Sequence, residues 1–489
     1  MNIIVWHRKD LRVEDNRALY EASRIGKPLP VYIFDPRLFS VERPHCDDRY
    51  IFLFECLADL DDQYKKIGSG LSLLWGDPVR ILKELTTKYS AIIFFNHDTS
   101  HGDDLERDKR ILSIDGSRAW TNDGVLRGKG SREGWFRNCE QYFEDPELRI
   151  PSDISANNIP SEIKTRDLIR KFSIHREKRG VPKGGKRSAK RKLNYFIDNM
   201  DSYMVNLKQE YIVESANSEL SPYISLGVLS LRTIYREVNK STKRSKDHYI
   251  NRLFWNQHHK QMMQDFPDLA ERAVNPVFDL YYEKIYSYDP DMVSAWKNGN
   301  TGFPVVDASM RALADTGFIN FSLRKMVSSF FCYIMKQPWK IGADHMYHHL
   351  IDADCAINYS WWQIIAGTVG AYDNVIYDPK TFSGKFDPEG IFIKEYIPEL
   401  KNTNMEYISM PWKISSKQLN DTETGIHREY VKPVVDFEYE YNQAVNIYRT
   451  VNIAAVESFR DPELLKRASL YGVIKKRVVK GQLPEIIRC

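Results

Sequence analysis

The chain has 489 residues, more than one hydrophobic core usually serves, so we expect at least two domains. A formal net charge of +4 argues against a general polyanion binder and allows one basic face on a balanced surface. The six cysteines form no C-x-x-C pair, which argues against a disulfide framework or a thiolate metal cluster and indicates a reducing compartment.

The N-terminus has a short apolar run, Ile3 to Trp6, that charged residues interrupt before it reaches the length of a signal-peptide core. No stretch of the sequence approaches the roughly 20 apolar residues that span a bilayer. We therefore expect a soluble monomer without a membrane partner. Its expected location is cytoplasmic, or nuclear if the host is eukaryotic.

Short apolar runs alternate with amphipathic stretches through the first third of the chain. Runs of four or five apolar residues followed by helical periodicity are typical of parallel strands with crossover helices. We therefore predict a doubly wound α/β domain over residues 1–135. The expected strand and helix pairs are Ile3–Trp6 with Asp15–Arg24, Val31–Phe34 with Asp48–Lys66, Leu71–Trp75 with Asp77–Tyr89, and Ile92–Phe95 with Asp103–Leu112.

Proline, glycine and charged residues break this pattern, so residues 136–195 are interpreted as an interdomain linker that turns into a helix at about Ser188. The basic end of the linker is interpreted as a solvated face, with nucleic-acid contact as the alternative. Helical periodicity then predicts a large all-helical domain over residues 196–489. Its last segment, Asp461–Cys489, is basic and poor in aromatic residues, which predicts poor order.

Three familiar motifs are incomplete in this chain. The run Gly180 to Lys186 approaches a phosphate-binding loop, but Arg187 stands where a serine or threonine must bind magnesium. No G-x-G-x-x-G follows an expected strand, so the usual dinucleotide fingerprint is missing. His345, His348 and His349 have helical spacing without convergent carboxylates, and we predict no metal site.

Polar residues interrupt an apolar segment at Asp352, Asp354 and Asn358, which we expect to be buried. Buried carboxylates need a cation or hydrogen-bond donors, and Arg324 is the guanidinium that we assign to them. With the nearby indoles of Trp339 and Trp362, this composition indicates one wall of a flavin pocket with a path for electrons. A purely structural polar network is the alternative.

Several motifs, in order over nearly the whole chain, resemble the photolyase and cryptochrome family, and class I DNA photolyases in particular. The segment Trp6–Leu19 resembles the opening strand and loop of that family, and Asn217–Gly227 resembles its flavin-phosphate segment. Further matches are Thr301–Arg311, Lys385–Gly390, Tyr396–Leu400 and Pro433–Asp436. Asn358–Trp362 and Ala366–Gly370 resemble DASH cryptochromes, which act on single-stranded DNA.

The resemblance implies that the helical domain binds a U-shaped FAD and that the α/β domain carries a second, antenna chromophore of folate or deazaflavin type. By the same resemblance, Arg324 and Asp352 pair beside the isoalloxazine, while Asp354 hydrogen-bonds to the edge of that ring. Asn358 faces N5; plant cryptochromes have an aspartate there, so the neutral amide favours repair. The residues assigned to the flavin phosphates are Ser218, Leu220, Ser221 and, more loosely, Tyr203.

The resemblance also implies an aromatic relay that reduces the flavin. Trp362 is its proximal member and Trp339 its middle member. Tyr286 occupies the position of the outermost tryptophan of the family, so the surface end of the relay differs here. Tyr286 can donate an electron only if its phenol can lose a proton.

Trp255 matches the tryptophan on which the family stacks a flipped-out, damaged dinucleotide. Its surroundings depart from the family. Arg252 replaces a glutamate, Phe321 and Ser322 replace an asparagine and an arginine, and Ile364 replaces a second aromatic wall. These departures leave the lesion type open and also fit a signalling flavoprotein.

The sequence therefore predicts a deoxyribodipyrimidine photo-lyase that splits pyrimidine dimers in double- or single-stranded DNA. The reaction is driven by electron transfer from photoexcited reduced FAD. One alternative is a cryptochrome-type blue-light photoreceptor without repair activity. Another is a non-catalytic binding scaffold that has lost the cofactor.

Overall fold

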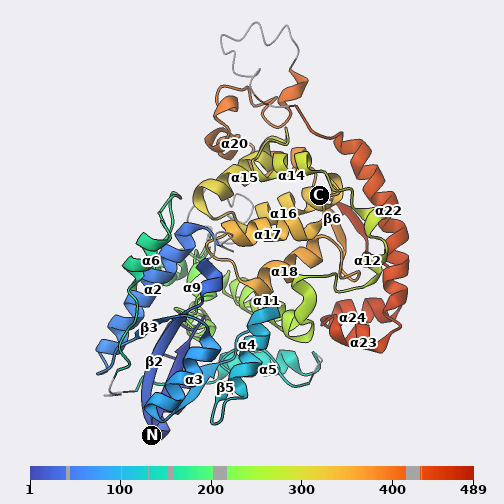
Figure 1. Cartoon of the computed structure of the whole chain (residues 1–489). Coiled ribbons are helices and arrows are strands. Elements are labelled where there is room, and N and C mark those ends of the chain that lie inside the picture. Colours follow the sequence, from blue (N-terminus) through green and yellow to red (C-terminus); the bar gives the residue numbers. More distant parts are fainter. Residues whose placement is uncertain are drawn as a thin grey trace.

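Parallel strands form a sheet at the N-terminal end of the chain (Figure 1). The computed structural model describes residues 1–39, 45–100, 102–129, 132–151, 154, 158–201, 217–414, 430 and 432–489. Within these residues the sheet has five strands in the order β3-β2-β1-β4-β5, and all neighbouring pairs are parallel. Its elements are β1 (Asn2–His7), α1 (Arg17–Ile25), β2 (Lys27–Phe34), η1 (Pro36–Phe39), α2 (Asp47–Lys65), β3 (Ser72–Trp75), α3 (Pro78–Tyr89), β4 (Ala91–Asn96), α4 (Gly102–Leu112) and β5 (Arg118–Trp120).

Different helices cover the two faces of the sheet. Because side chains alternate along a strand, Ile3 and Val5 pack with α1 and α2, whereas Ile4 and Trp6 pack with α3 and α4. The doubly wound domain and the four strand and helix pairs predicted from the apolar runs are confirmed. The fifth strand, β5, has only three residues and no apolar run that could reveal it.

The segment predicted as a linker contains regular structure and contributes to the N-terminal core. Phe143, Leu168 and Leu193 lie in the same buried cluster as Phe52 of α2. The helix expected near Ser188 begins at Lys186. The helices from this segment to the start of the second core are α5 (Trp135–Glu144), α6 (Thr165–Lys171), α7 (Lys186–Asp198), α9 (Ser221–Ser225), α10 (Leu231–Asn239) and α11 (Lys246–Asp265).

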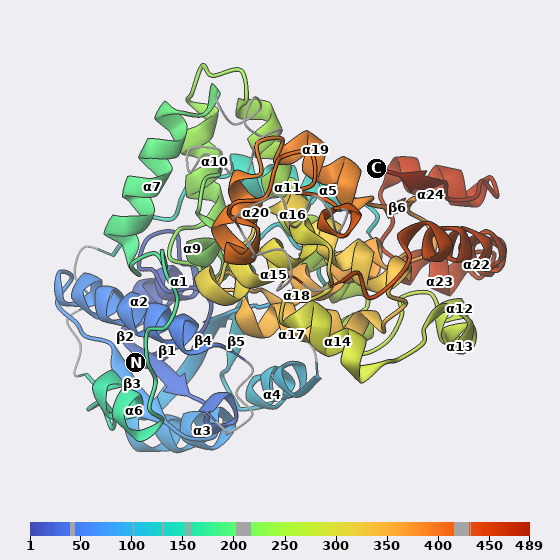
Figure 2. The same ribbon diagram turned by 90° about the horizontal axis from the view of Figure 1, so that it is seen from above.

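A second, larger core begins within α11, because Leu253 belongs to the first core and Met263 to the second. Viewed from above, α7 and α10 lie on one side of the molecule and α22 to α24 on the other, with α15 to α18 between them (Figure 2). The α/β plus all-α fold class is confirmed. Among the described helices, none combines the length and apolar character that crossing a bilayer requires.

The elements of the second core are mostly helices. They are η3 (Pro267–Ala270), α12 (Val277–Leu280), α13 (Tyr282–Ile285), α14 (Pro290–Lys297), α15 (Pro304–Thr316), α16 (Phe321–Ser329), η4 (Phe330–Ile334), α17 (Trp339–His349), α18 (Cys355–Ile365), β6 (Asn374–Ile376), α19 (Pro379–Phe386), α20 (Ile391–Tyr396), η5 (Pro398–Leu400), η6 (Pro411–Lys413), α22 (Phe437–Ser458), α23 (Pro462–Arg467), α24 (Gly472–Val479) and β7 (Ile486–Arg488).

The prediction that Asp461–Cys489 is poorly ordered is wrong. The segment forms α23, α24 and β7, and β7 pairs in parallel with β6, with Ile487 opposite Val375. Arg488 then reaches Asp378 at 2.9 Å. Strand pairing and this ion pair hold a segment whose composition alone indicates a solvated tail.

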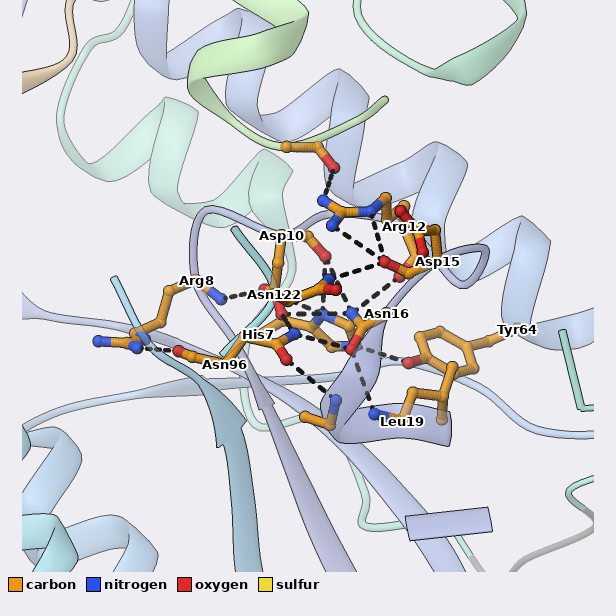
Figure 3. A network of polar contacts seen from close by, with 12 residues as sticks. His7, Arg8, Asp10, Arg12, Asp15, Asn16, Leu19, Tyr64, Asn96 and Asn122 are labelled. Carbon is orange, nitrogen blue, oxygen red and sulfur yellow. Dashed lines mark hydrogen bonds and ion pairs between the residues drawn. The ribbon is translucent and has the colours of Figure 1, made fainter. Parts of the chain in front are cut away.

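A buried polar network occupies the carboxyl ends of β1 and β4 (Figure 3). The Asp10 carboxylate accepts hydrogen bonds from the Arg8 backbone N–H (2.9 Å) and from Asn96 Nδ2 (2.6 Å). His7 Nδ1 lies 3.3 Å from the same carboxylate, and His7 Nε2 lies 2.6 Å from the Tyr64 hydroxyl. Burial by itself would raise the pKa of Asp10, but His7 and these hydrogen bonds hold that pKa well below its usual range. The charged carboxylate therefore sets the shape of the loop after β1.

This loop docks on the turn that follows α9. The Leu11 backbone N–H donates to the Leu226 carbonyl at 3.0 Å, and Arg12 Nη1 donates to the Gly227 carbonyl at 2.8 Å. Gly227 has a φ of 64°, and a Cβ there would lie 2.2 Å from the Lys9 carbonyl oxygen. Only glycine permits so close an approach in this backbone conformation. The contact ties the sheet to α9.

We expect Gly227→Ala to lower the free energy of unfolding in urea by about 2 kcal/mol or more, because the added methyl group forces the loop and the turn apart. Gly384→Ala is the matched control. Gly384 lies in α19 with no atom within 4 Å of its Cβ position, so this change should be neutral or stabilising by up to about 1 kcal/mol. Equal stabilities of the two variants would contradict the docking role of Gly227.

Candidate functional site

A cavity of about 480 Å³ lies where α9, α11, α16, α17 and α18 meet. This volume is in the range of roughly 300 to 1,000 Å³ that is usual for small-molecule and cofactor sites. Predicted site residues that are far apart in the sequence come together in its wall. They are Ser221, Arg252, Trp255, Phe321, Arg324, Asp352, Asp354, Asn358 and Trp362.

Arg324 and Asp352 form an ion pair in the cavity wall. Arg324 Nη2 lies 3.1 Å and 3.0 Å from the two carboxylate oxygens of Asp352, and Arg324 Nε donates to the Ile319 carbonyl at 2.8 Å. The Asp352 side chain is 5% exposed. Because both groups are held by several hydrogen bonds, they form a fixed dipole beside any ligand in the cavity.

Asp354 has two partners in the protein. It begins α18 by accepting a hydrogen bond from the Ile357 backbone N–H at 3.2 Å, and Lys260 Nζ lies 3.8 Å from its other oxygen. Its side chain is 3% exposed. The capping bond orients the carboxylate, and Lys260 balances its charge.

Asn358 lies one helical turn after Asp354 on α18 and faces the same cavity. Its Nδ2 donates to the Ala343 carbonyl of α17 at 3.0 Å. This bond fixes the orientation of the amide before any ligand is present. A neutral, oriented amide is thus the polar group at this point of the wall.

The predicted relay aromatics are buried. Trp362 is 1% exposed, and a Cβ on Gly342 would lie 2.4 Å from its ring, so α17 packs directly on the indole. Trp339, at the start of α17, is 5% exposed, and Tyr286 is 6% exposed. The Tyr286 hydroxyl is buried and has no hydrogen-bond partner among the described residues. Burial raises the pKa of this phenol well above its usual value.

The mouth of the cavity is aromatic and cationic. Phe321 stacks on Trp361 with ring centroids 4.4 Å apart and an interplanar angle of 27°. Arg252 and Lys325 lie over the Phe321 ring at 5.2 Å and 5.0 Å from its centroid. With Trp255, these side chains surround an opening that offers ring faces and positive charge together.

Two predicted substrate residues, Ser322 and Ile364, lie outside the cavity lining. Ile364 is 8% exposed and belongs to the helical core. It lies two helical turns beyond Ile357 on the same face of α18, about 10 Å further along the axis. Phe321 and Trp361 provide stacked aromatic rings in the cavity lining instead.

The predicted flavin-phosphate segment lines a second cavity of about 210 Å³, which shares Ser221, Arg324 and Asp352 with the first. Ser218 lines it and accepts a hydrogen bond from the Tyr249 hydroxyl at 3.0 Å. Leu220 is fully buried in the N-terminal core, and its backbone N–H donates to Ser218 Oγ at 3.4 Å. Tyr203 lies outside the described residues.

Sequence reasoning missed Lys260, Lys325 and Trp361. Lys260 and Trp255 lie on the α11 face that lines the cavity, so helical spacing from Trp255 could have found Lys260. Lys325 directly follows Arg324, and Trp361 directly precedes Trp362. Their roles at the mouth depend on packing between α16 and α18, which no local pattern reveals.

The residues present fit a flavin. The two cavities share lining residues and are together called the joined cavities. Their walls contain apolar and aromatic side chains, and carboxylate, guanidinium and amide groups that are oriented by hydrogen bonds. The indole N–H of Trp361 is also buried without a hydrogen-bond partner among the described residues, which leaves one donor for a ligand.

The switch point of the sheet, between β1 and β4, does not fit a second pigment. Its crevice measures about 70 Å³ and contains an ion pair between Lys9 and Asp98 at 3.1 Å. Arg8 also pairs with Asp108 nearby. The antenna chromophore therefore remains a prediction without a site at this crevice.

Known proteins match the chain in both of its parts. Residues 3–114 match a family model described as DNA photolyase, and residues 249–450 match one described as the FAD binding domain of DNA photolyase. The deoxyribodipyrimidine photo-lyase of Alkalihalophilus pseudofirmus is 27% identical over 478 residues, which cover 91% of this chain and 97% of that protein. Cryptochrome-2 of Arabidopsis thaliana is 27% identical over 476 residues, 89% of this chain and 76% of its own.

A solved structure of an archaeal photolyase from Sulfolobus tokodaii with two FAD molecules has the same fold. It matches with a TM-score of 0.75 and 25% identity, and the match covers 92% of this chain and 100% of that one. Photolyases and cryptochromes are equally similar to the chain, so similarity alone does not separate repair from photoreception. The two family models and the shared two-domain fold show that the chain belongs to the photolyase and cryptochrome family.

Proposed function

We propose that the chain is a light-driven DNA repair lyase that binds FAD in the joined cavities and splits pyrimidine dimers. The observation that carries this proposal is the mouth of the cavity, where Trp255, Phe321 and Trp361 surround the opening with Arg252 and Lys325 beside them. Exposed ring faces flanked by cations are the means by which proteins hold unstacked bases and their phosphates. Photoreception alone needs no such opening.

FAD, when bound, supplies the light absorption and the one-electron chemistry that opens the cyclobutane ring. Arg324 and Asp352 hold the ring system through fixed charges, and Ser218 and Ser221 offer hydroxyls to the phosphates. The amide of Asn358 carries no acidic proton, so it supports an anionic ring without protonating it. Trp362 is the adjacent indole that can give an electron to the flavin.

At the mouth, the chain separates the damaged dinucleotide from water and neighbouring bases. Trp255 stacks on one face of the flipped pair, and the Phe321 and Trp361 stack bounds the other. Arg252 and Lys325 neutralise the adjoining phosphates. His259 in the same wall stays neutral, because burial, with the nearby Arg132 charge, lowers its pKa to about 4. A neutral imidazole adds no proton source beside the reacting bases.

We expect the chemically reduced, FAD-loaded protein to restore thymines in dimer-containing oligonucleotides under blue light, measured by chromatography of the digested product. No restoration should occur in darkness or with boiled protein. If dimers persist in both single and double strands while the flavin stays reduced, repair is excluded and the photoreceptor alternative is favoured.

Asp352→Asn should release FAD and lower the free energy of unfolding by about 3 kcal/mol, because it leaves the Arg324 guanidinium partly buried without its anion. Flavin absorbance after gel filtration and urea unfolding measure the two effects. Glu84→Gln removes the partner of Arg80 from an ion pair whose side chains are 60% and 61% exposed, so it should cost below about 1 kcal/mol. The assigned role of Asp352 would be contradicted if the Asp352→Asn protein kept its FAD and had the same free energy of unfolding as the Glu84→Gln control.

Trp255→Ala and Phe321→Ala should each weaken binding of a dimer-containing oligonucleotide about tenfold or more, since stacking contributes roughly 1 to 3 kcal/mol per base. Ile391→Ala is the control, because Ile391 is 44% exposed on α20. Fluorescence anisotropy at constant salt gives the dissociation constants. Unchanged constants in both aromatic variants would place the lesion elsewhere.

A further inference from the structure

We infer that Tyr282 is the solvent-side end of the electron relay that starts at Trp362. The inference rests on the proposed function, because it names the residue that replaces the electron which Trp362 gives up. Tyr282 begins α13 and is 44% exposed. Its ring centroid lies 5.1 Å from that of Tyr286, at an interplanar angle of 60°.

The inner part of the path follows α17. The Trp362 ring packs on the backbone of Gly342, and Trp339 lies three residues earlier on the same face of that helix. Trp339, Tyr286 and Tyr282 then line one cavity of about 190 Å³. Trp362 and Trp339 thus lie along α17, and Trp339, Tyr286 and the exposed Tyr282 line one cavity, so these four aromatic side chains form the proposed path from the main cavity to the surface.

A second branch from Trp362 ends inside the protein. Trp296 lies 6.2 Å from Trp362 between ring centroids, but it is 0% exposed. Its indole N–H donates to the Val327 carbonyl at 3.1 Å. Because Trp296 has no exposed surface, a reductant in solution cannot contact the oxidised indole and cannot reduce it directly.

Proton balance distinguishes Tyr282 from Tyr286. An oxidised phenol is a strong acid and must release its proton to persist as a neutral radical. The buried Tyr286 hydroxyl has no described acceptor, whereas the exposed Tyr282 hydroxyl can release its proton to water. Tyr282 thus loses one electron to the relay and one proton to solvent. An external thiol returns one electron and one proton, and is itself oxidised to the thiyl radical that pairs to a disulfide.

The test compares Tyr282→Phe with Tyr195→Phe in FAD-loaded protein under blue light and external thiol. Tyr195 is 56% exposed on α7, remote from the relay helices. Electron paramagnetic resonance on protein with ring-deuterated tyrosine identifies the radical. We expect a tyrosyl signal in the parent and in Tyr195→Phe, and its loss in Tyr282→Phe together with slower flavin photoreduction. Flavin content and the unfolding midpoint verify that each variant is folded.

A tyrosyl signal that persists unchanged in Tyr282→Phe overturns the inference, and its loss only in Tyr286→Phe would assign the terminus to that buried residue instead. These outcomes leave the proposed function intact, because repair is assayed with chemically reduced protein. Failure of the proposed function has a different signature. In that case the parent protein binds no flavin, or reduced protein leaves dimers unsplit while the tyrosyl signal is present.

Discussion

The docking of the loop after β1 on the turn after α9 is the contact on which the site depends. The loop has its shape because the buried Asp10 carboxylate accepts hydrogen bonds from the Arg8 backbone N–H, Asn96 and Asn16. The turn can approach the loop because Gly227 has no side chain. α9 begins three residues after Ser218 and lines the main cavity. The polar network at the sheet edge therefore positions residues that lie more than two hundred positions away in sequence. Apolar contacts alone would not fix the position of the loop relative to the turn.

Within the cavity, the carboxylates lie apart from the cations that pack on aromatic rings at the mouth. The carboxylates of Asp352 and Asp354 each have a cation, Arg324 and Lys260, so the positive and negative charges in the deep wall are paired. At the mouth, Arg252 and Lys325 lie over the ring of Phe321, which stacks on Trp361. Under the proposed function, the positive charge at the mouth attracts the DNA phosphates, and the flavin lies behind it. A chain with a small net charge would in this way recognise DNA at one place.

Local rules were enough to predict several features. Apolar runs predicted the strands, and helical periodicity predicted the crossover helices. The ion pair of Arg324 with Asp352 could be predicted because a buried charge needs a partner. The ordered structure of the C-terminal segment could not be predicted, because β7 is stable only when it pairs with β6. The sequence has Ile364 where the family has a second aromatic wall, and a comparison of one position at a time could not reveal another aromatic wall at the mouth. Phe321 and Trp361, far apart in sequence, build that wall only after α16 packs on α18. The surface end of the relay likewise depends on tertiary packing, because Trp339 of α17 lines the same cavity as Tyr286 and Tyr282, about fifty residues earlier in the chain.

The central claim is that one continuous site holds a flavin behind a damaged dinucleotide. A crystal structure of the reduced, FAD-loaded protein with a dimer-containing single strand tests it most directly. The account predicts the isoalloxazine between the Arg324–Asp352 pair and Asn358, with the dimer between Trp255 and the Phe321–Trp361 stack. A cavity closed by its own side chains, or a dimer bound away from Trp255, would contradict it.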